Sequence, residues 1–291
     1  MLVSRLFSVV VFCYSVLVGC EAPRDSTRGE PLDVTERYEV AVLGKIDRQQ
    51  MQESSGLARA DSAATEFWTH GDAGSPPVLY RVARTGALRQ TVRVGGANNY
   101  DWEDLTRDGQ GRLYLGDFGN NRNDRRDLTV YRFDPAHPAQ PADTIRFRYA
   151  DQHAFPPGKA YRNFDCEAFY YAHDSLFLFT KNRAKGGGLL VKQYGMPARP
   201  GKYVLAALDS LALETWVTAA DISPDGRTVA LLGYGFVYLF EGAPGQRVFD
   251  RPRRRIQLET TGQAEALTFV NNHDFVLSNE SGKLFQVSRT R

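Results

Sequence analysis

The chain has 291 residues, of which 24% are charged and 42% are hydrophobic, and its formal net charge is +2. A balance so close to neutral gives no overall field for nucleic acid, and we expect no nucleic-acid partner. The approximately 255 residues after the N-terminal segments suffice for one large core, because all-β single domains reach this size.

Residues 1–19 have the pattern of a secretory signal. Arg5 supplies the positive charge, and Leu6–Val18 is an apolar stretch too short to span a membrane. The stretch ends in Leu17-Val18-Gly19-Cys20, which resembles the bacterial lipobox. The resemblance implies that Cys20 is lipidated and attaches the mature protein to a membrane. The alternative is an ordinary secretory signal with an incidental cysteine.

Residues 20–36 are polar and contain Pro23, Gly29 and Pro31, which favours a flexible tether. With a lipid on Cys20, the protein is expected in the bacterial cell envelope, lipid-anchored and facing the periplasm or the surface. Cys166 is the one cysteine beyond the signal and the lipidation site. Its neighbours Asp165 and Glu167 would raise the thiol pKa, so a buried core role is favoured over a nucleophile.

Residues 37–291 contain a weak repeat of about 40–50 residues, the mark of a β-propeller with one four-stranded sheet per repeat. Each copy has an apolar first strand, a turn of Gly, Asp or Asn, a second apolar strand, a polar loop and a third strand. The first strands contain Ser55-Gly56-Leu57, Glu103-Asp104-Leu105, Glu167-Ala168-Phe169, Ala220-Asp221-Ile222 and Glu265-Ala266-Leu267.

The outer strands are less regular. Candidates for the fourth strands are Thr91–Val94, Thr144–Tyr149, Tyr203–Leu208 and Arg255–Leu258. The fifth copy lacks a fourth strand, and Tyr38–Leu43 at the other end of the domain can supply it. This pairing would close the ring and remove two exposed sheet edges. The sequence therefore predicts an all-β fold, a single five-bladed propeller closed by the N-terminal strand. Six blades are the alternative, because about 64 residues separate Leu105 from Phe169.

Polar residues gather at one end of the predicted blades. The start of each first strand and the end of each second strand lie at the same end, since the two strands are antiparallel. The first-strand starts carry Glu53, Glu103, Asp104, Asp165, Glu167, Asp221 and Glu265, and the second-strand ends carry His70, Asp72, Asp117, Lys181, Asn279 and Glu280. The opposite face receives ordinary hairpin turns. The sequence therefore predicts an acidic face around the axis.

Carboxylates crowded around an axis must be protonated, paired or bound to a cation. Oxygen ligands suit Ca²⁺ or Mg²⁺ better than Zn²⁺. The candidate metal ligands are Glu103, Asp104, Glu167, Asp221 and Glu265, and the candidate catalytic residues are Glu103, Glu167 and Glu265. Two alternatives stay open: bracing of neighbouring blades by the glutamates, and pairing with Lys181, Arg122 or Arg183. No zinc-type cluster or phosphate loop is present, and no nucleotide or haem is expected.

A ligand at this face would meet residues at the pocket rim. The candidate ligand-binding residues are Asp72, Trp102, Asp117, Asn121, Lys181 and Glu280. Trp102 could stack on a sugar or an aromatic ligand, or it could pack between blades.

With these residues in view, the chain resembles a broad group of exported bacterial propellers. The pieces that carry the resemblance are Trp102-Glu103-Asp104-Leu105, Gly116-Asp117-Phe118-Gly119-Asn120-Asn121, Asp165–Phe169, Ala220–Gly226 and Ala264–Leu267. More loosely, it resembles gluconolactonase-like and phytase-like esterase propellers, and that relation implies a divalent cation on the axis. A fold alone does not fix a function.

Two functions follow from these observations. The first is a lipid-anchored binding or scaffolding module that presents its acidic face to a protein, peptide or glycan. The second is a cation-dependent hydrolase of an ester, lactone, phosphoester or glycoside, with an axial Glu or Asp as general base.

Overall fold

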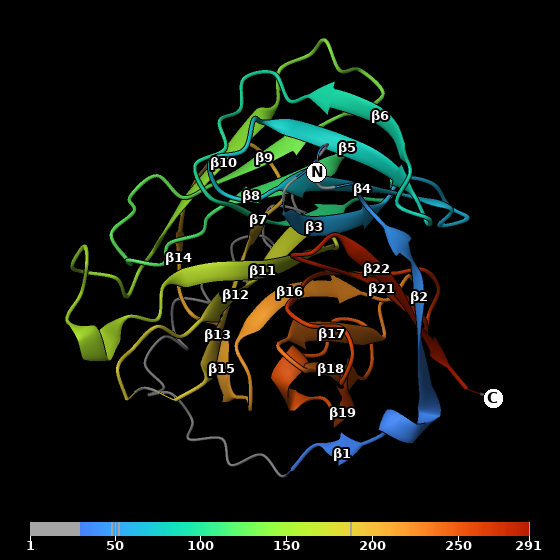
Figure 1. The fold of residues 1–291 in the computed structure, drawn as a ribbon. Coiled ribbons are helices and arrows are strands. Elements are labelled where there is room, and N and C mark those ends of the chain that lie inside the picture. The colour runs from blue at the N-terminus through green and yellow to red at the C-terminus, as the bar shows by residue number, and fades with distance from the viewer. Residues whose placement is uncertain (1–29, 48, 50, 52, 187, 291) are drawn as a thin grey trace, which may run out of the picture.

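The computed structural model describes residues 30–47, 49, 51, 53–186 and 188–290, and these form five antiparallel sheets arranged as a ring (Figure 1). The predicted signal, Cys20 and the first part of the predicted tether lie outside the described residues. Among the described residues, no helix is long and apolar enough to cross a membrane. The prediction of a five-bladed all-β propeller is confirmed, and the six-bladed alternative is wrong.

In blades one to four, the strands run outward from the axis in chain order. Blade one contains β3 (Ser54–Arg59), β4 (Glu66–Gly71), β5 (Val78–Ala83) and β6 (Leu88–Arg93). Blade two contains β7 (Trp102–Arg107), β8 (Leu113–Asp117), β9 (Thr129–Phe133) and β10 (Asp143–Tyr149). Blade three contains β11 (Asp165–Ala172), β12 (Ser175–Lys181), β13 (Leu190–Pro197) and β15 (Asp209–Ala212). Blade four contains β16 (Val217–Ile222), β17 (Thr228–Gly233), β18 (Phe236–Glu241) and β19 (Arg253–Gln257).

Blade five is built from both ends of the described chain. It contains β20 (Ala264–Phe269), β21 (Phe275–Asn279), β22 (Lys283–Arg289) and, outermost, β2 (Tyr38–Lys45). The antiparallel register of β2 on β22 pairs Tyr38 with Arg289 and Lys45 with Lys283. The predicted closure by an N-terminal strand is therefore confirmed, and β2 covers the edge that β22 would otherwise expose.

Two further strands extend blades in parallel. β14 (Gly201–Leu205) pairs with β10 of blade two, and β1 (Leu32–Asp33) pairs with β19 of blade four. The assignment of Tyr203–Leu208 to blade three is wrong, because β15 occupies that edge. Alternation identified a strand there but could not identify its partner. Residues 32–33, placed in the tether by the sequence, lie against a blade. Short 3₁₀ helices are η1 (Thr35–Arg37), η2 (Lys159–Tyr161) and η3 (Val248–Asp250).

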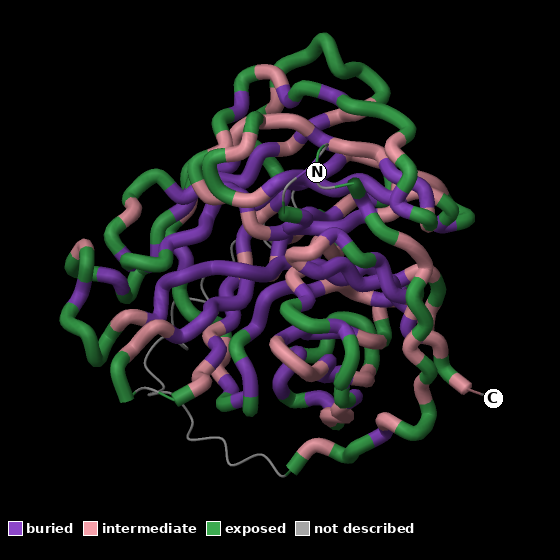
Figure 2. Tube along the Cα trace, in the orientation of Figure 1, coloured by how far each residue is buried: buried purple, intermediate pink, exposed green. Residues whose placement is uncertain are grey.

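The core lies between adjacent blades and around the axis. Buried segments concentrate in the inner strands, while the outer strands and loops alternate or are exposed (Figure 2). Large side chains such as Trp102, Tyr114 and Phe169 are fully buried between blades. Their packing supplies the main apolar stabilisation of the ring.

Asp104 bonds three blades together. It is fully buried, and its carboxylate accepts hydrogen bonds from the backbone N–H groups of Leu105, Phe169 and Ala220, on the innermost strands of blades two, three and four. Asp221 does the same between blades four and five, where it accepts from the N–H of Phe269 and the hydroxyl of Thr268. The alternative that axial carboxylates brace the blades therefore applies to these two residues.

We expect Asp104→Ala to lower the free energy of unfolding by about 3–5 kcal/mol, because it leaves three buried N–H donors without an acceptor. Urea denaturation would measure the loss. The control is Asp143→Ala, which removes a half-exposed carboxylate paired with Arg132 on an outer strand and should cost less than about 1 kcal/mol. Equal costs for the two variants would contradict the bracing role.

Candidate functional site

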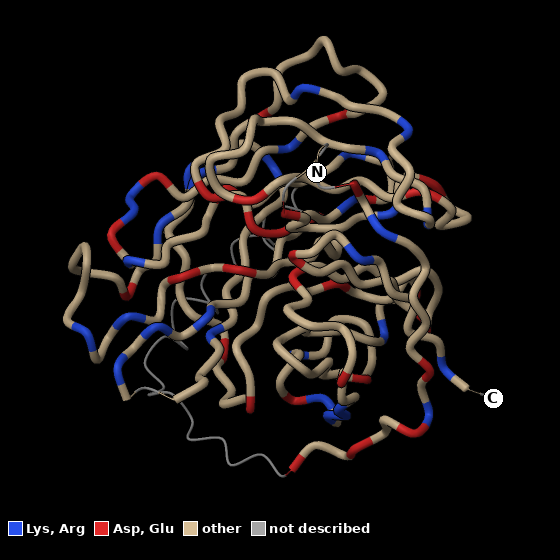
Figure 3. Tube along the Cα trace, viewed as in Figure 1, with Lys and Arg blue, Asp and Glu red and all other residues tan. Residues whose placement is uncertain are grey.

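An acidic pocket lies on the axis, where the innermost strands begin. It has a volume of about 230 Å³. Seven carboxyl groups and two cationic side chains line it, and these are Glu53, Asp72, Asp101, Glu103, Glu167, Glu265, Glu280, Lys181 and Arg183. Figure 3 shows segments of Asp and Glu around the centre of the ring. The predicted acidic axial face is therefore present.

Each innermost strand has a β-bulge near its start, and in three blades the bulge carries a residue that lines this pocket. The pairing of first and second strands shifts by one residue in every blade, at Gly56, at Glu103 and Asp104, at Glu167, at Thr218 and at Glu265. A bulge leaves its extra residue outside the ladder and redirects that residue's side chain. Three of the five bulges carry a glutamate that lines the pocket.

Several pocket acids already have partners. Glu167 accepts hydrogen bonds from Lys181 at 3.2 Å and from Arg183 at 3.0 Å, and Arg183 also contacts Asp165 at 2.6 Å. Glu265 accepts a hydrogen bond from the Tyr234 hydroxyl at 2.9 Å. Burial alone would lower the pKa of Lys181, but the charges of Glu167, Tyr234 and Glu265 together raise it. Pairing with Lys181 and Arg183 thus neutralises one side of the pocket.

Asp72, Asp101 and Glu103 form the other side. One carboxylate oxygen from each lies within 4.8 Å of the others. Within the described residues, none of these side chains forms an ion pair or accepts a hydrogen bond from a protein donor. Calcium–oxygen distances of about 2.3–2.6 Å allow one ion to contact three oxygens at this spacing. This acidic triad could hold a metal ion.

Gly119 leaves room for the triad. A methyl group built on Gly119 would lie 2.1 Å from Oε1 of Glu103 and 2.5 Å from Cγ of Asp101. Any larger residue at this position would therefore displace the two carboxylates. The loop after β8 therefore contributes to the site, because the absence of a side chain at Gly119 leaves space for these carboxylates.

The pKa values of Asp101 and Glu103 reflect burial and repulsion by neighbouring carboxylates. Burial, and then the charge of Asp165, raises the pKa of Asp101 to about 6. Burial, followed by Glu167 and Asp101, raises the pKa of Glu103 well above its usual value. Burial also raises the pKa of Glu265 to about 7, although Lys181 and Tyr234 oppose the change. These raised pKa values indicate carboxylates that repel one another, and a bound cation would reduce that repulsion.

The structure brings together most of the predicted site residues. Glu103, Glu167, Glu265, Asp72, Asn121, Lys181 and Glu280 all line the pocket. Asp117 is buried beside it and accepts hydrogen bonds from Arg125 and from the N–H of Asp101, so it supports the loop instead of facing a ligand. Trp102 is fully buried, its Nε1 donates to Asn98, and it packs edge-on against His70, as in the alternative of packing between blades.

Asp104 and Asp221 do not face this pocket. The repeat alignment placed Ala220-Asp221-Ile222 opposite Glu265-Ala266-Leu267, but the bulge of β16 is at Thr218. The alignment was therefore shifted, and Asp221 lies toward the other end of its strand. Cys166 is buried in the core, as predicted, and burial raises the pKa of its thiol.

The sequence reasoning missed Asp101, Tyr234 and Gly119. A signal for Asp101 existed, because residues two apart on an extended segment point the same way and Asp101 precedes Glu103 by two. Tyr234 carries no such signal, since it lies in the hairpin between β17 and β18 and reaches Glu265 only through the fold.

No protein-family model and no curated protein matches this chain. Among solved structures, a PQQ-bound aldose sugar dehydrogenase from Streptomyces coelicolor is 9% identical with a TM-score of 0.51, covering 86% of this chain and 98% of that one. A gluconolactonase from Xanthomonas campestris is 14% identical with a TM-score of 0.49, covering 93% and 96%. Virginiamycin B lyase from Staphylococcus aureus is 10% identical with a TM-score of 0.41, covering 81% of this chain and 66% of that one. The neighbours thus include gluconolactonase-like and other propellers, and the likeness concerns the fold alone.

We expect Glu103→Gln to stabilise the cation-free protein more at pH 8 than at pH 6.5. A carboxyl whose pKa is raised on folding holds its proton more tightly in the folded state, so stability is lost as pH rises through the folded pKa. The gain should be on the order of 1 kcal/mol, since one pKa unit corresponds to about 1.4 kcal/mol. Chemical denaturation with a chelator present would measure it.

The comparison starts at pH 6.5 because burial lowers the pKa of His70 to about 4. Below pH 6.5, the titration of His70 makes the folded state more stable as pH rises, which is opposite to the effect of Glu103. The control is Glu53→Gln, which changes an exposed carboxyl of the same pocket. A stability difference between wild type and Glu103→Gln that does not change with pH would contradict the assigned repulsion.

Proposed function

We propose that the axial pocket is a divalent-cation-dependent ligand-binding site of an envelope protein anchored through lipid on Cys20. The observation that carries the proposal is the triad of Asp72, Asp101 and Glu103, whose oxygens lie within one ion's reach and form no ion pair with another described residue. All-oxygen carboxylate ligands favour Ca²⁺ or Mg²⁺ over transition metals. The cation would leave positions open for oxygen atoms of a ligand.

Two exposed aromatic side chains beside the pocket support a ligand with an apolar face. Tyr100 is 61% exposed, directly precedes Asp101 and lies 5.9 Å from the Arg125 guanidinium. Trp216 is 38% exposed and lies 5.5 Å from Arg183 on the opposite, basic side. Hydroxyl groups for the cation and a ring face for an aromatic side chain are features of a sugar. A glycan is therefore the partner that we favour over a protein or peptide.

Calcium or magnesium added to the purified protein should raise its melting temperature, because a ligand that binds only the folded state stabilises it by mass action. Glu103→Gln should weaken cation binding at least tenfold. Gly119→Ala should do the same without changing any charge, since its methyl group displaces Glu103 and Asp101. Calorimetric titration would measure the affinities, and the affinity should fall from pH 7 to pH 5 as the carboxyls gain protons.

The matched control for the glycine is Gly109→Ala, since a methyl group on Gly109 meets no atom within 4 Å. Glu53→Gln controls for loss of a pocket charge. The proposal would be abandoned if neither cation changed the melting temperature, or if Glu103→Gln bound cation as tightly as wild type.

Hydrolysis is the second candidate function, and the state of Glu265 favours it. A carboxyl with a pKa of about 7, held by Tyr234 and near Lys181, can take up and release a proton at neutral pH. Next to a cation-bound ester, lactone, phosphoester or glycoside, it could remove a proton from attacking water. The metal would supply Lewis-acid polarisation of the substrate.

If the protein is a hydrolase, Glu265→Gln should lower kcat by about 10²–10⁴-fold and leave cation affinity within twofold of wild type. Tyr234→Phe should raise the pKa of the acidic limb of the rate profile, because the hydrogen bond from the Tyr234 hydroxyl lowers the pKa of Glu265. Glu265→Gln should remove that limb. A screen of lactone, ester, phosphoester and glycoside substrates would supply the assay. Full activity in Glu265→Gln would remove this residue from the mechanism and leave binding as the function.

A further inference from the structure

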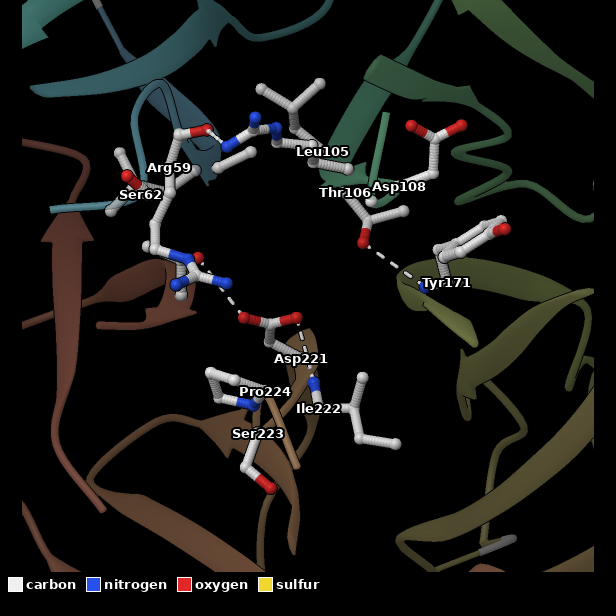
Figure 4. Close-up of a pocket in the computed structure, with 15 residues that line it drawn as sticks. Arg59, Ser62, Leu105, Thr106, Asp108, Tyr171, Asp221, Ile222, Ser223 and Pro224 are labelled. Carbon is white, nitrogen blue, oxygen red and sulfur yellow. Dashed lines mark hydrogen bonds between the residues drawn. The ribbon is translucent and has the colours of Figure 1, made fainter. Parts of the chain in front are cut away.

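A second pocket lies at the opposite end of the axis, where the innermost strands end (Figure 4). Its volume is about 360 Å³, and residues at or beyond the ends of β3, β7, β11, β16 and β20 line it. The sequence indicated only ordinary turns at this end. A volume of this size accommodates a small organic molecule.

Two arginines define the chemistry of this pocket. Arg59 is the last residue of β3 and Arg107 is the last residue of β7, so they occupy matching positions in adjacent blades. Arg107 donates a hydrogen bond to the backbone carbonyl of Arg59 at 3.3 Å, which holds its guanidinium at the pocket wall. Figure 4 shows the Arg59 side chain at the cavity with Asp221 below it.

Neither arginine has an ion-pair partner among the described residues. The nearby acids are engaged elsewhere. Asp108 binds Arg112 at 2.6 Å, and Asp61 accepts hydrogen bonds from Thr65 and Glu66. Asp221 accepts from Ile222, Thr268 and Phe269. Burial, and then the repulsion of Arg59, lowers the pKa of Arg107, which is the reverse of what a paired arginine shows.

We propose that Arg59 and Arg107 bind the oxyanion, a phosphate or a carboxylate, of a small organic ligand in this pocket. Guanidinium groups match both anions through paired N–H donors, and binding would relieve the repulsion between the two arginines. The Thr106 hydroxyl accepts from the N–H of Tyr171, so its own hydrogen is free to donate toward the cavity. Leu57, Leu105 and Pro224 offer apolar contacts for the remainder of the ligand.

This pocket is chemically opposite to the acidic one. Cations are expected at the start of the innermost strands and anions at their end, and neither expectation depends on the other. The Asp221 carboxylate also limits the ligand. The lining has two arginines and two carboxylates, Asp108 and Asp221, and Asp108 is paired with Arg112. This balance suits one anionic group and disfavours a polyanion such as nucleic acid.

The experiment is calorimetric titration of the purified protein with inorganic phosphate and, separately, with malonate, each at fixed ionic strength set with sodium chloride. We expect saturable binding of at least one of the two. Arg59→Gln should weaken this anion binding at least fivefold. Arg107→Lys should also weaken it, because lysine keeps the positive charge but lacks the paired N–H donors of the guanidinium group. Arg89→Gln, on an outer strand, should leave it unchanged.

Stronger binding of phosphate would indicate a phosphate-bearing ligand, and stronger binding of malonate a carboxylate-bearing one. A response no greater than that to sodium chloride, or undiminished binding in Arg59→Gln, would overturn the proposal. Calcium titration of Arg59→Gln, in a phosphate-free buffer, should match wild type. That result keeps failure of the anion site distinct from failure of the cation site.

Discussion

All five innermost strands run in the same direction along the axis, and this common direction decides where the polar side chains of the centre lie. Residues near the strand starts meet at one end, and residues near the strand ends meet at the other. The ring therefore places the carboxylates of Glu103, Glu167 and Glu265 at one end, beside Lys181 and Arg183. It places the guanidinium groups of Arg59 and Arg107 at the other end, beside Asp221. Apolar packing between blades holds the two ends apart.

The carboxylates of the centre serve two purposes that their surroundings distinguish. Asp104 and Asp221 accept backbone hydrogen bonds across blade boundaries and are used up in holding the ring together. Asp72, Asp101 and Glu103 have no such donors and remain at the pocket wall. A single carboxylate can either brace the blades or face a cation. In this chain, some carboxylates of the centre brace the blades, and others face the pocket.

The fold could be predicted from sequence because apolar alternation and turn residues recur in every blade, and because the missing fourth strand had a candidate at Tyr38–Leu43. The site was predicted in outline for the same reason. Its details required the register: the bulge of β16 is at Thr218, so Asp221 lies toward the other end of the strand, and a repeat alignment does not reveal which residue occupies the bulge. The partner of β14 was likewise decided by tertiary packing, since alternation marks a strand without naming its neighbour.

The closure of blade five also constrains how the chain can fold. β2 is near the N-terminal end of the described chain, and its antiparallel partner β22 is near the C-terminal end. During synthesis, β2 stays without its partner until nearly the entire domain has been made. Such long-range pairing slows folding. The ring therefore cannot close before β22, near the C-terminal end of the described chain, is available to pair with β2.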